Sequence, residues 1–403
     1  MKRLLVVVAA MLVLAPTSAF AAPGNLDTTF SGDGVAKLSL MASSRQVLVD
    51  SLNRVYVGGE VASGKPFAGN AIVVRYKANG VLDSAFSGDG KVYLGSLGPV
   101  LGLELAGGNV LALTRDRLFS IKPSGAPNNA FDLDGQIVVY RSRDANDGTD
   151  PLAVGPDGLI YVLHECPNCD HFRLSFVDQY SSSGKWLRDY SFEDLSLQVL
   201  TVYGQKLYAA GVSAAPTQTE TRAAVTSLTL PSLEPNTSFG GGTVYHSIDQ
   251  YGAHYESWPY GVLVAPGSLK VTIVGEWYNC PVGDYCSAGG FFPWAMRFLP
   301  DGSPDPYFNG SGEFRPYDGS PFVAGAMQSN GRVVVVSPGY ANTGDGSDYG
   351  FFVRRLTSTG QWDPSFNAPA LRLPNMLAED VATSHNLSRI VVVGTQYVAR
   401  YFG

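Results

Sequence analysis

The stretch GVLDSAFSGDG at residues 80–90 decides the fold, because a near copy, GNLDTTFSGDG, stands at residues 24–34. Five looser copies follow along the chain: GAPNNAFDLDG at 125–135, GKWLRDYSFED at 184–194, LEPNTSFGGG at 233–242, GSPDPYFNGSG at 302–312 and GQWDPSFNAPA at 360–370. The phenylalanines that the seven copies share are Phe30, Phe86, Phe131, Phe192, Phe239, Phe308 and Phe366. They are 45 to 69 residues apart, a period typical of the blades of a β-propeller.

Each copy follows the same series of apolar segments, which predicts four antiparallel strands per repeat. A Val-rich run such as RVYVGG (54–59), KLYAAG (206–211) or RIVVVG (389–394) is the second strand of the series. A segment that ends in Arg and a large residue, such as AIVVRY (71–76), is the third strand and leads into the copy. Short β-rich runs separated by Gly, Asn and Asp turns are typical of up-and-down sheets. We name the strands A to D, with the repeated motif between C and D.

The two ends of the chain are predicted to complete one blade together. Residues 376–384, 389–394 and 397–401 read as strands A, B and C, with no fourth strand behind them. The segment GVAKLSL at 34–40 follows the first copy without strands A, B or C before it. Pairing of residues 34–40 with 396–402 would remove two exposed sheet edges. The sequence therefore predicts an all-β fold, a seven-bladed β-propeller of four-stranded antiparallel blades, closed by an N-terminal strand.

The pattern LD-x-x-F-x-GDG, placed after an Arg-Tyr strand, resembles the delta-60 repeat of secreted bacterial proteins. The resemblance is strong at residues 24–34 and 71–92, and moderate at 295–314 and 351–366. It implies a propeller-like fold. Because the family has no assigned function, the resemblance implies no catalytic residue.

The repeated motif is interpreted as architecture rather than as a ligand site. Gly88 and Gly90 suit a positive backbone φ, and Phe86 is expected to pack between blades. Asp83 and Asp89 can accept hydrogen bonds from loop amides. Calcium is the alternative, because carboxylates beside glycine turns suit hard cations. Several copies lack the second carboxylate, which disfavours calcium: they hold Gly241, Ser311 and Ala368 at this position.

Residues 1–21 have the features of a secretory signal, with two early basic residues, an apolar run over 4–15 and an Ala-Phe-Ala ending. We expect cleavage after Ala21, a single propeller domain over residues 22–403, and a secreted or periplasmic location. No later segment is predicted to span a membrane. Nucleic acid is not an expected partner, because the chain has 35 acidic against 28 basic residues and no basic cluster.

Variable loops and the repeated motif are expected on opposite faces of the ring, because every strand reverses direction. The longest variable loop, at 277–294, and the connection that begins at residue 247 bring many aromatic side chains to one blade. Exposed aromatic rings favour a protein or carbohydrate ligand. Packing of the long loop onto its own blade is the alternative. The candidate ligand-binding residues are Trp258, Tyr260, Trp277, Tyr278, Tyr285 and Trp294.

Four cysteines form two close pairs, Cys166 with Cys169 and Cys280 with Cys286. In an exported chain, such local pairs predict disulfides that staple loops. The first pair lies in HECPNCDH (164–171), which also offers four donors for zinc. A redox centre is a third interpretation, disfavoured because a strand rather than a helix follows the C-x-x-C. No metal and no cofactor are expected.

Two functional hypotheses follow from these patterns. The first is a monomeric binding module without catalysis. The second is a propeller-type enzyme acting on a sugar, either a lyase or a quinone- or metal-dependent dehydrogenase, with histidines at the mouth of the channel. The expected inner strands are poor in titratable residues, which favours the first hypothesis. These strands are RQVLVDS (45–51), VLGLELA (100–106), LQVLTVYG (197–204) and PFVAGAMQS (321–329).

Overall fold

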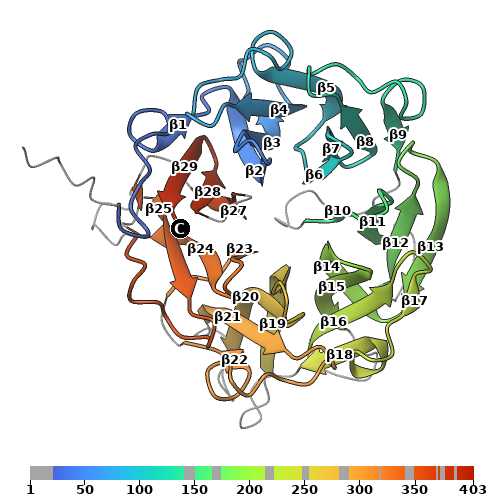
Figure 1. The fold of residues 1–403 in the computed structure, drawn as a ribbon, viewed down its shortest axis with the longest axis vertical. Helices are drawn as coiled ribbons and strands as arrows, with labels where there is room; N and C mark the ends of the chain where they lie inside the picture. Colours follow the sequence, from blue (N-terminus) through green and yellow to red (C-terminus); the bar gives the residue numbers. More distant parts are fainter. Residues whose placement is uncertain are drawn as a thin grey trace, which may run out of the picture.

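A computed structural model shows the chain as a ring of seven sheets around a central axis (Figure 1). The predicted all-β fold, a seven-bladed propeller of four-stranded antiparallel blades, is confirmed. No helix in the described part of the chain is long and apolar enough to cross a membrane. The structure describes residues 21–139, 150–165, 174–213, 222–246, 254–280, 290–316, 319–340, 349–368, 371–372, 377–384 and 388–403.

Each blade has its first strand next to the axis and its last strand at the rim (Figure 1). Blade 1 consists of β2 (Met41–Val49), β3 (Val55–Val61), β4 (Asn70–Tyr76) and β5 (Lys91–Leu97). Blade 2 consists of β6 (Gly102–Ala106), β7 (Asn109–Leu113), β8 (Arg117–Ile121) and β9 (Gln136–Val138). Blade 3 consists of β10 (Leu152–Val154), β11 (Ile160–Glu165), β12 (Ser175–Tyr180) and β13 (Trp186–Phe192). Blade 4 consists of β14 (Leu195–Tyr203), β15 (Lys206–Ser213), β16 (Arg222–Thr229) and β17 (Glu234–Pro235), with a 3-10 turn at Gly240–Gly242 and a further strand, β18 (Thr243–His246), on β16.

The remaining blades follow the same order. Blade 5 consists of β19 (His254–Val264), β20 (Val271–Cys280), β21 (Gly290–Phe298) and β22 (Glu313–Phe314). Blade 6 consists of β23 (Ala324–Met327), β24 (Val333–Tyr340), β25 (Tyr349–Leu356) and β26 (Leu371–Arg372). Blade 7 consists of β27 (Ala378–Thr383), β28 (Arg389–Gly394), β29 (Tyr397–Phe402) and, from the other end of the chain, β1 (Val35–Lys37).

Seven apolar clusters fill the seven interfaces between adjacent blades. Strand alternation sorts the side chains between them: in β3, Val55 and Val57 pack toward blade 7, whereas Tyr56 packs toward blade 2. Both faces of a second strand are therefore covered by neighbouring blades. This explains why second strands have continuous apolar runs, such as RVVVVS at 332–337, instead of alternating patterns.

Strand β1 completes blade 7 by pairing with β29, with Val35 opposite Ala399 and Lys37 opposite Tyr397. The predicted closure of the ring by the N-terminal strand is therefore confirmed. This pairing joins the two ends of the chain. Every blade therefore has a neighbouring blade on both sides, and no blade leaves the face of its sheet uncovered at the seam.

The repeated motif forms the connection between strands C and D, on the face opposite the loops that join B to C and D to A. Gly88 and Gly90 have φ angles of 83° and 85°, and Phe86 is fully buried between blades 1 and 2. Asp83 and Asp89 accept hydrogen bonds from loop amides at 3.2 and 3.1 Å. The architectural interpretation of these residues is confirmed.

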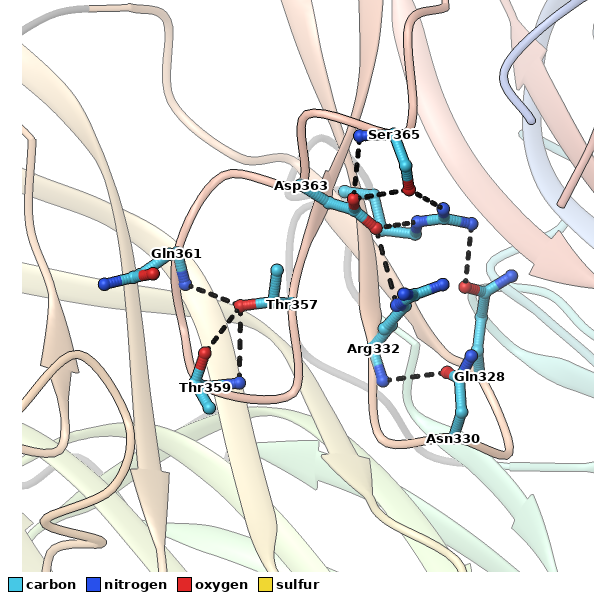
Figure 2. A network of polar contacts seen from close by, with 9 residues as sticks. Gln328, Asn330, Arg332, Thr357, Thr359, Gln361, Asp363 and Ser365 are labelled. Carbon is cyan, nitrogen blue, oxygen red and sulfur yellow. Dashed lines mark hydrogen bonds and ion pairs between the residues drawn. The ribbon is translucent and has the colours of Figure 1, made fainter. Parts of the chain in front are cut away.

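In six of the seven blades, a polar side chain near the end of strand C forms an ion pair or a hydrogen bond with a polar side chain of the motif. In four blades this is an arginine–aspartate ion pair, with Nε–Oδ2 distances of 2.7 to 2.9 Å: Arg75–Asp83, Arg297–Asp305, Arg355–Asp363 and Arg400–Asp27. In two blades an asparagine donates to a serine at 3.1 Å: Asn128 to Ser120 and Asn236 to Ser227. Figure 2 shows how Asp363 of blade 6 also contacts Ser365 and Arg332.

Consecutive motifs touch at their first glycine. A Cβ on Gly80 would lie 2.5 Å from the amide nitrogen of Ser31 and 3.0 Å from the ring of Phe30, so only glycine fits. The Ser31 N–H donates to the carbonyl of Asn79 at 2.8 Å. The same close approach recurs in the motifs around the ring: Gly125 on Ser87, Gly302 on Gly240 and Gly360 on Phe308. Gly184, in the turn between β12 and β13, lies against Phe131 in a similar way. The motif is thus a joint between neighbouring blades.

The prediction of a motif copy at residues 184–194 is wrong. Trp186–Phe192 is strand β13, which a tight turn joins to β12, and Phe192 lies in that strand instead of a C–D connection. The turn is closed by the Gly184 N–H, which donates to the Ser181 carbonyl at 2.9 Å. The segment lacks the Asp-Gly pair with which the strong copies turn, so the chain extends directly into strand D.

Candidate functional site

Four inner strands carry a β-bulge, which makes them irregular where they approach the axis. Apart from a second irregularity at Ala42, near the start of β2, the extra residues are Arg45 in β2, Gln198 in β14, Tyr260 in β19 and Glu379 in β27. All four are polar, although the strands around them are rich in Val and Leu. Bulges re-aim side chains and are frequent next to functional sites.

A glycine of the second strand faces each of these bulges. The residue before the bulge is paired with Gly59, Gly211, Gly275 or Gly394. A Cβ on Gly59 would lie 2.0 Å from a carbonyl oxygen of β2, and a Cβ on Gly275 would lie 1.9 Å from one of β19. The glycines of RVYVGG and KLYAAG are therefore the signal in the sequence that marks these bulges.

The seven blades surround an axial cavity of about 190 Å³. Much of its wall is apolar, with side chains such as Val47, Leu103 and Val262. Of the four inner strands expected to be poor in titratable groups, VLGLELA contributes Glu104 to this cavity, and two further carboxyl groups, Asp150 and Asp380, line it from other segments. The polar lining residues are Gln46, Glu104, Asp150, Thr201, Tyr260 and Asp380.

Two of these carboxyl groups have pKa values well above their ordinary values. Burial raises the pKa of Glu104 to about 7. Burial also raises the pKa of Asp380 to about 7, although that carboxylate accepts hydrogen bonds from the N–H groups of Val47 at 2.8 Å and Val381 at 2.7 Å. Because Val47 belongs to blade 1, Asp380 also joins the first and last blades next to the axis. Both groups titrate near neutral pH and change the charge of the cavity there.

Tyr260 connects this cavity to β20, the second strand of blade 5. Its hydroxyl donates to Oε1 of Glu276 at 2.7 Å. Burial raises the pKa of Glu276, and this hydrogen bond opposes the shift. In the sheet, Glu276 lies opposite Trp258. Of the candidate aromatic residues in the described part of the chain, Tyr260 is the one that lines the axial cavity.

Strand alternation places Trp277 and Trp294 on the side of blade 5 that packs against blade 4. Both side chains are fully buried. Trp277 stacks on Phe292 with 5.1 Å between ring centroids, and Nε1 of Trp294 donates to Glu313 at 2.9 Å. Trp277 and Trp294 therefore pack the loop onto its own blade, which was the alternative to ligand binding. Their indole rings do not reach the surface.

The other side of blade 5 carries Trp258 and Tyr278, which are half-buried, together with Phe291. Phe291 lies 4.7 Å from Tyr278 and 6.1 Å from Trp258, measured between ring centroids. Its side chain is 51% exposed. We call Trp258, Tyr278 and Phe291 the blade 5 aromatic surface. It lies at the end of the strands that the variable B–C loop joins.

Several nominated residues lie outside the described residues, namely Tyr285, Cys166, Cys169 and Cys286. Of Cys280 only the backbone is described, as the last residue of β20. Among the described residues, no group of three or more His, Cys, Asp or Glu side chains is arranged to hold a metal ion.

No known protein family and no curated protein matches the chain. Similar folds occur among solved structures. The WD40 domain of Pan2 from Neurospora crassa shares 10% identity with a TM-score of 0.52, over 94% of this chain and 98% of that domain. A chain of a mitotic checkpoint complex shares 9% identity with a TM-score of 0.53, over 100% of this chain and 99% of the other. At this identity, the likeness shows the propeller fold alone.

Proposed function

We propose that this protein is a binding module that takes a protein partner on the face of the variable loops, with the blade 5 aromatic surface at the centre of the interface. The observation that carries the proposal is the half-exposed Phe291, seated against Trp258 and Tyr278. Clustered aromatic side chains with one exposed face are typical of the energetic centres of interfaces. The closed ring supplies the rigid scaffold on which such a surface works.

We further propose that the chain is an exported member of the delta-60 repeat family, with disulfides between Cys166 and Cys169 and between Cys280 and Cys286. Signal cleavage would leave Ala22 as the first residue of the mature protein. N-terminal sequencing and peptide mass mapping without reductant test both points. Unblocked, alkylatable thiols in the exported protein would contradict the disulfides.

The proposed interface is tested with the mature chain immobilised and cross-linked to proteins of its own compartment. Phe291→Ala and Trp258→Ala should each reduce the yield of the captured partner, and the affinity measured afterwards with the purified partner should fall by roughly tenfold or more. Tyr307→Ala is the matched control, because Tyr307 is 75% exposed but lies in the motif of the same blade, on the opposite face.

Equal loss of capture in the Tyr307 variant, or undiminished affinity in both blade 5 variants, would contradict the proposed interface. A glycan array probed with the same proteins separates the two ligand classes. Saturable glycan binding that depends on Phe291 would replace the protein partner by a carbohydrate. Turnover of a sugar by the purified chain would instead support the enzyme hypothesis.

A further inference from the structure

We propose that the axial cavity is a binding site for a small organic cation that carries an ammonium or guanidinium group. The cavity is separate from the blade 5 aromatic surface, so this proposal does not depend on the identity of the protein partner. Three carboxyl groups from three different blades, Glu104, Asp150 and Asp380, converge on it. Among the described residues, no Lys or Arg lines it.

The first argument is that Glu104 and Asp380 hold two buried carboxyl groups in the wall of one confined cavity. Asp380 and Glu104 belong to inner strands on both sides of β2, and Asp150 precedes β10. Ionised carboxylates in a confined apolar wall repel one another and lose hydration. A cation placed between them would reverse both effects, because it supplies opposite charge and hydrogen-bond donors at once.

Gln46 is the second, independent argument. Its side chain is only 6% exposed and lines the cavity. Among the described residues, its amide group makes no hydrogen bond. Buried amides of this kind are normally satisfied, so its carbonyl oxygen is available to accept from an N–H donor of a ligand. The β-bulge at Arg45 brings this polar residue to the axis beside Val47.

The size and composition of the cavity limit the ligand. A volume of about 190 Å³ is close to the ~150 Å³ cavity that accommodates benzene, so about six to nine non-hydrogen atoms fit. A single metal ion is disfavoured, because the described carboxyl groups are not clustered tightly enough to ligate one. The apolar wall of Val47, Leu103 and Val262 suits the methylene groups of an alkylamine.

Isothermal titration calorimetry of the mature chain with putrescine and with agmatine tests the proposal. We expect one site per chain and no saturable heat from 1,4-butanediol, which has the same chain length without charge. Near neutral pH, binding should release about one proton, because the cation favours the ionised form of carboxyl groups that titrate there. The measured enthalpy should therefore differ between phosphate and Tris buffers.

Glu104→Gln and Gln46→Leu should each weaken putrescine binding by roughly tenfold. Asp380→Asn should do the same, and thermal unfolding shows whether that variant remains folded; if it does not, the other two variants decide. Asp134→Asn, in an exposed turn of the blade 2 motif, is the control and should bind as the unmodified chain does.

Two sources could supply the cation, a free amine or a lysine or arginine side chain of a partner. Tighter binding of the peptide Gly-Gly-Arg-Gly-Gly than of agmatine would identify the side chain as the ligand, and the reverse order would identify the free amine. Absence of saturable heat with all three probes at millimolar concentration would overturn the proposal. Equal affinity in all the cavity variants would overturn it too. Phe291→Ala should leave putrescine binding unchanged, which keeps this result separate from the test of the partner interface.

Discussion

Asp27 and Arg400 lie 373 positions apart in the chain and form an ion pair of 2.9 Å at the seam of the ring. The Asp27 carboxylate is fully buried, and it also accepts from Arg389 and Thr29. Burial alone would raise the pKa of Asp27, but these contacts outweigh it and hold the pKa below its ordinary value. The ends of the chain are therefore joined by charge as well as by strand pairing.

Asp27→Asn should destabilise the folded ring by about 3 kcal/mol, because it leaves the buried Arg400 guanidinium without its counter-charge. Urea unfolding followed by circular dichroism measures the loss. Asp33→Asn is the control: Asp33 belongs to the same motif but is exposed, and its loss should cost less than about 0.5 kcal/mol. Equal unfolding midpoints for the two variants would show that the seam does not need this pair.

Gly59→Ala should cost about 2 kcal/mol of stability, because the new Cβ would stand 2.0 Å from the Ser43 carbonyl oxygen that the bulge in β2 pushes toward it. Gly64→Ala is the comparison. That glycine has a φ of 76° and open space around it, so its substitution should cost only about 1 kcal/mol of backbone strain. The unfolding free energies of both variants test the account, and the reverse order would contradict it.

The stability of the ring should decrease as the pH rises from about 5 to 8. Glu104 and Asp380 each have a pKa of about 7 in the folded chain, above the values of 4.5 and 3.8 for exposed groups. The folded state therefore binds more protons in this range, and their stabilising contribution is complete below about pH 4 and lost as the pH rises through 7. Glu379 beside Asp380 adds to its shift, and Arg45 acts on Glu379 in the opposite sense.

Unfolding free energies of the unmodified chain and of Glu104→Gln, measured at several pH values, check this dependence. The variant should show a flatter decline, because one of the two titrating groups is gone. A stability that rises between pH 5 and 8 in the unmodified chain would contradict the raised pKa values. Carboxylates with lowered pKa, such as Asp27 and Asp363, act in the opposite direction and only at acid pH.

Trp294→Ala should destabilise the chain by about 4 kcal/mol, since it empties a fully buried site between blades 4 and 5 and removes the donor to Glu313. Phe291→Ala, three residues away in the same strand, should change stability by less than about 1 kcal/mol because that ring is half-exposed. Thermal melting separates the two. Similar losses would mean that the blade 5 aromatic surface serves packing instead of binding.

The blade count and the seam were predictable because both depend on residues that repeat. Six of the seven phenylalanines mark a joint between blades, and the missing fourth strand after residue 401 matches the unpaired segment 34–40. The prediction of a copy at 184–194 was wrong because its phenylalanine, Phe192, lies in strand β13. Arg75 ends the segment AIVVRY and Asp83 lies in the motif, so both stand out in the sequence. Their ion pair could be seen only in the geometry of the C–D turn.

The candidate site was harder to predict because it depends on irregularities. A bulge shifts the alternation of a strand by one residue, so Gln46 and Asp380 reach the axis from positions that no periodic pattern marks. The buried state of Trp277 follows from alternation, since its neighbour Tyr278 faces the other side of the blade. Alternation along the strand therefore separates buried Trp277 from half-buried Tyr278 on the basis of the sequence alone.

The contact between Gly80 and Phe30, repeated at other junctions of the ring, gives successive blades the same two mating surfaces. A gene segment that runs from Gly80 to Gly125, or from Gly302 to Gly360, therefore encodes one unit that begins and ends at such a contact. Duplication or loss of such a unit would alter the circumference of the ring and the width of its hole.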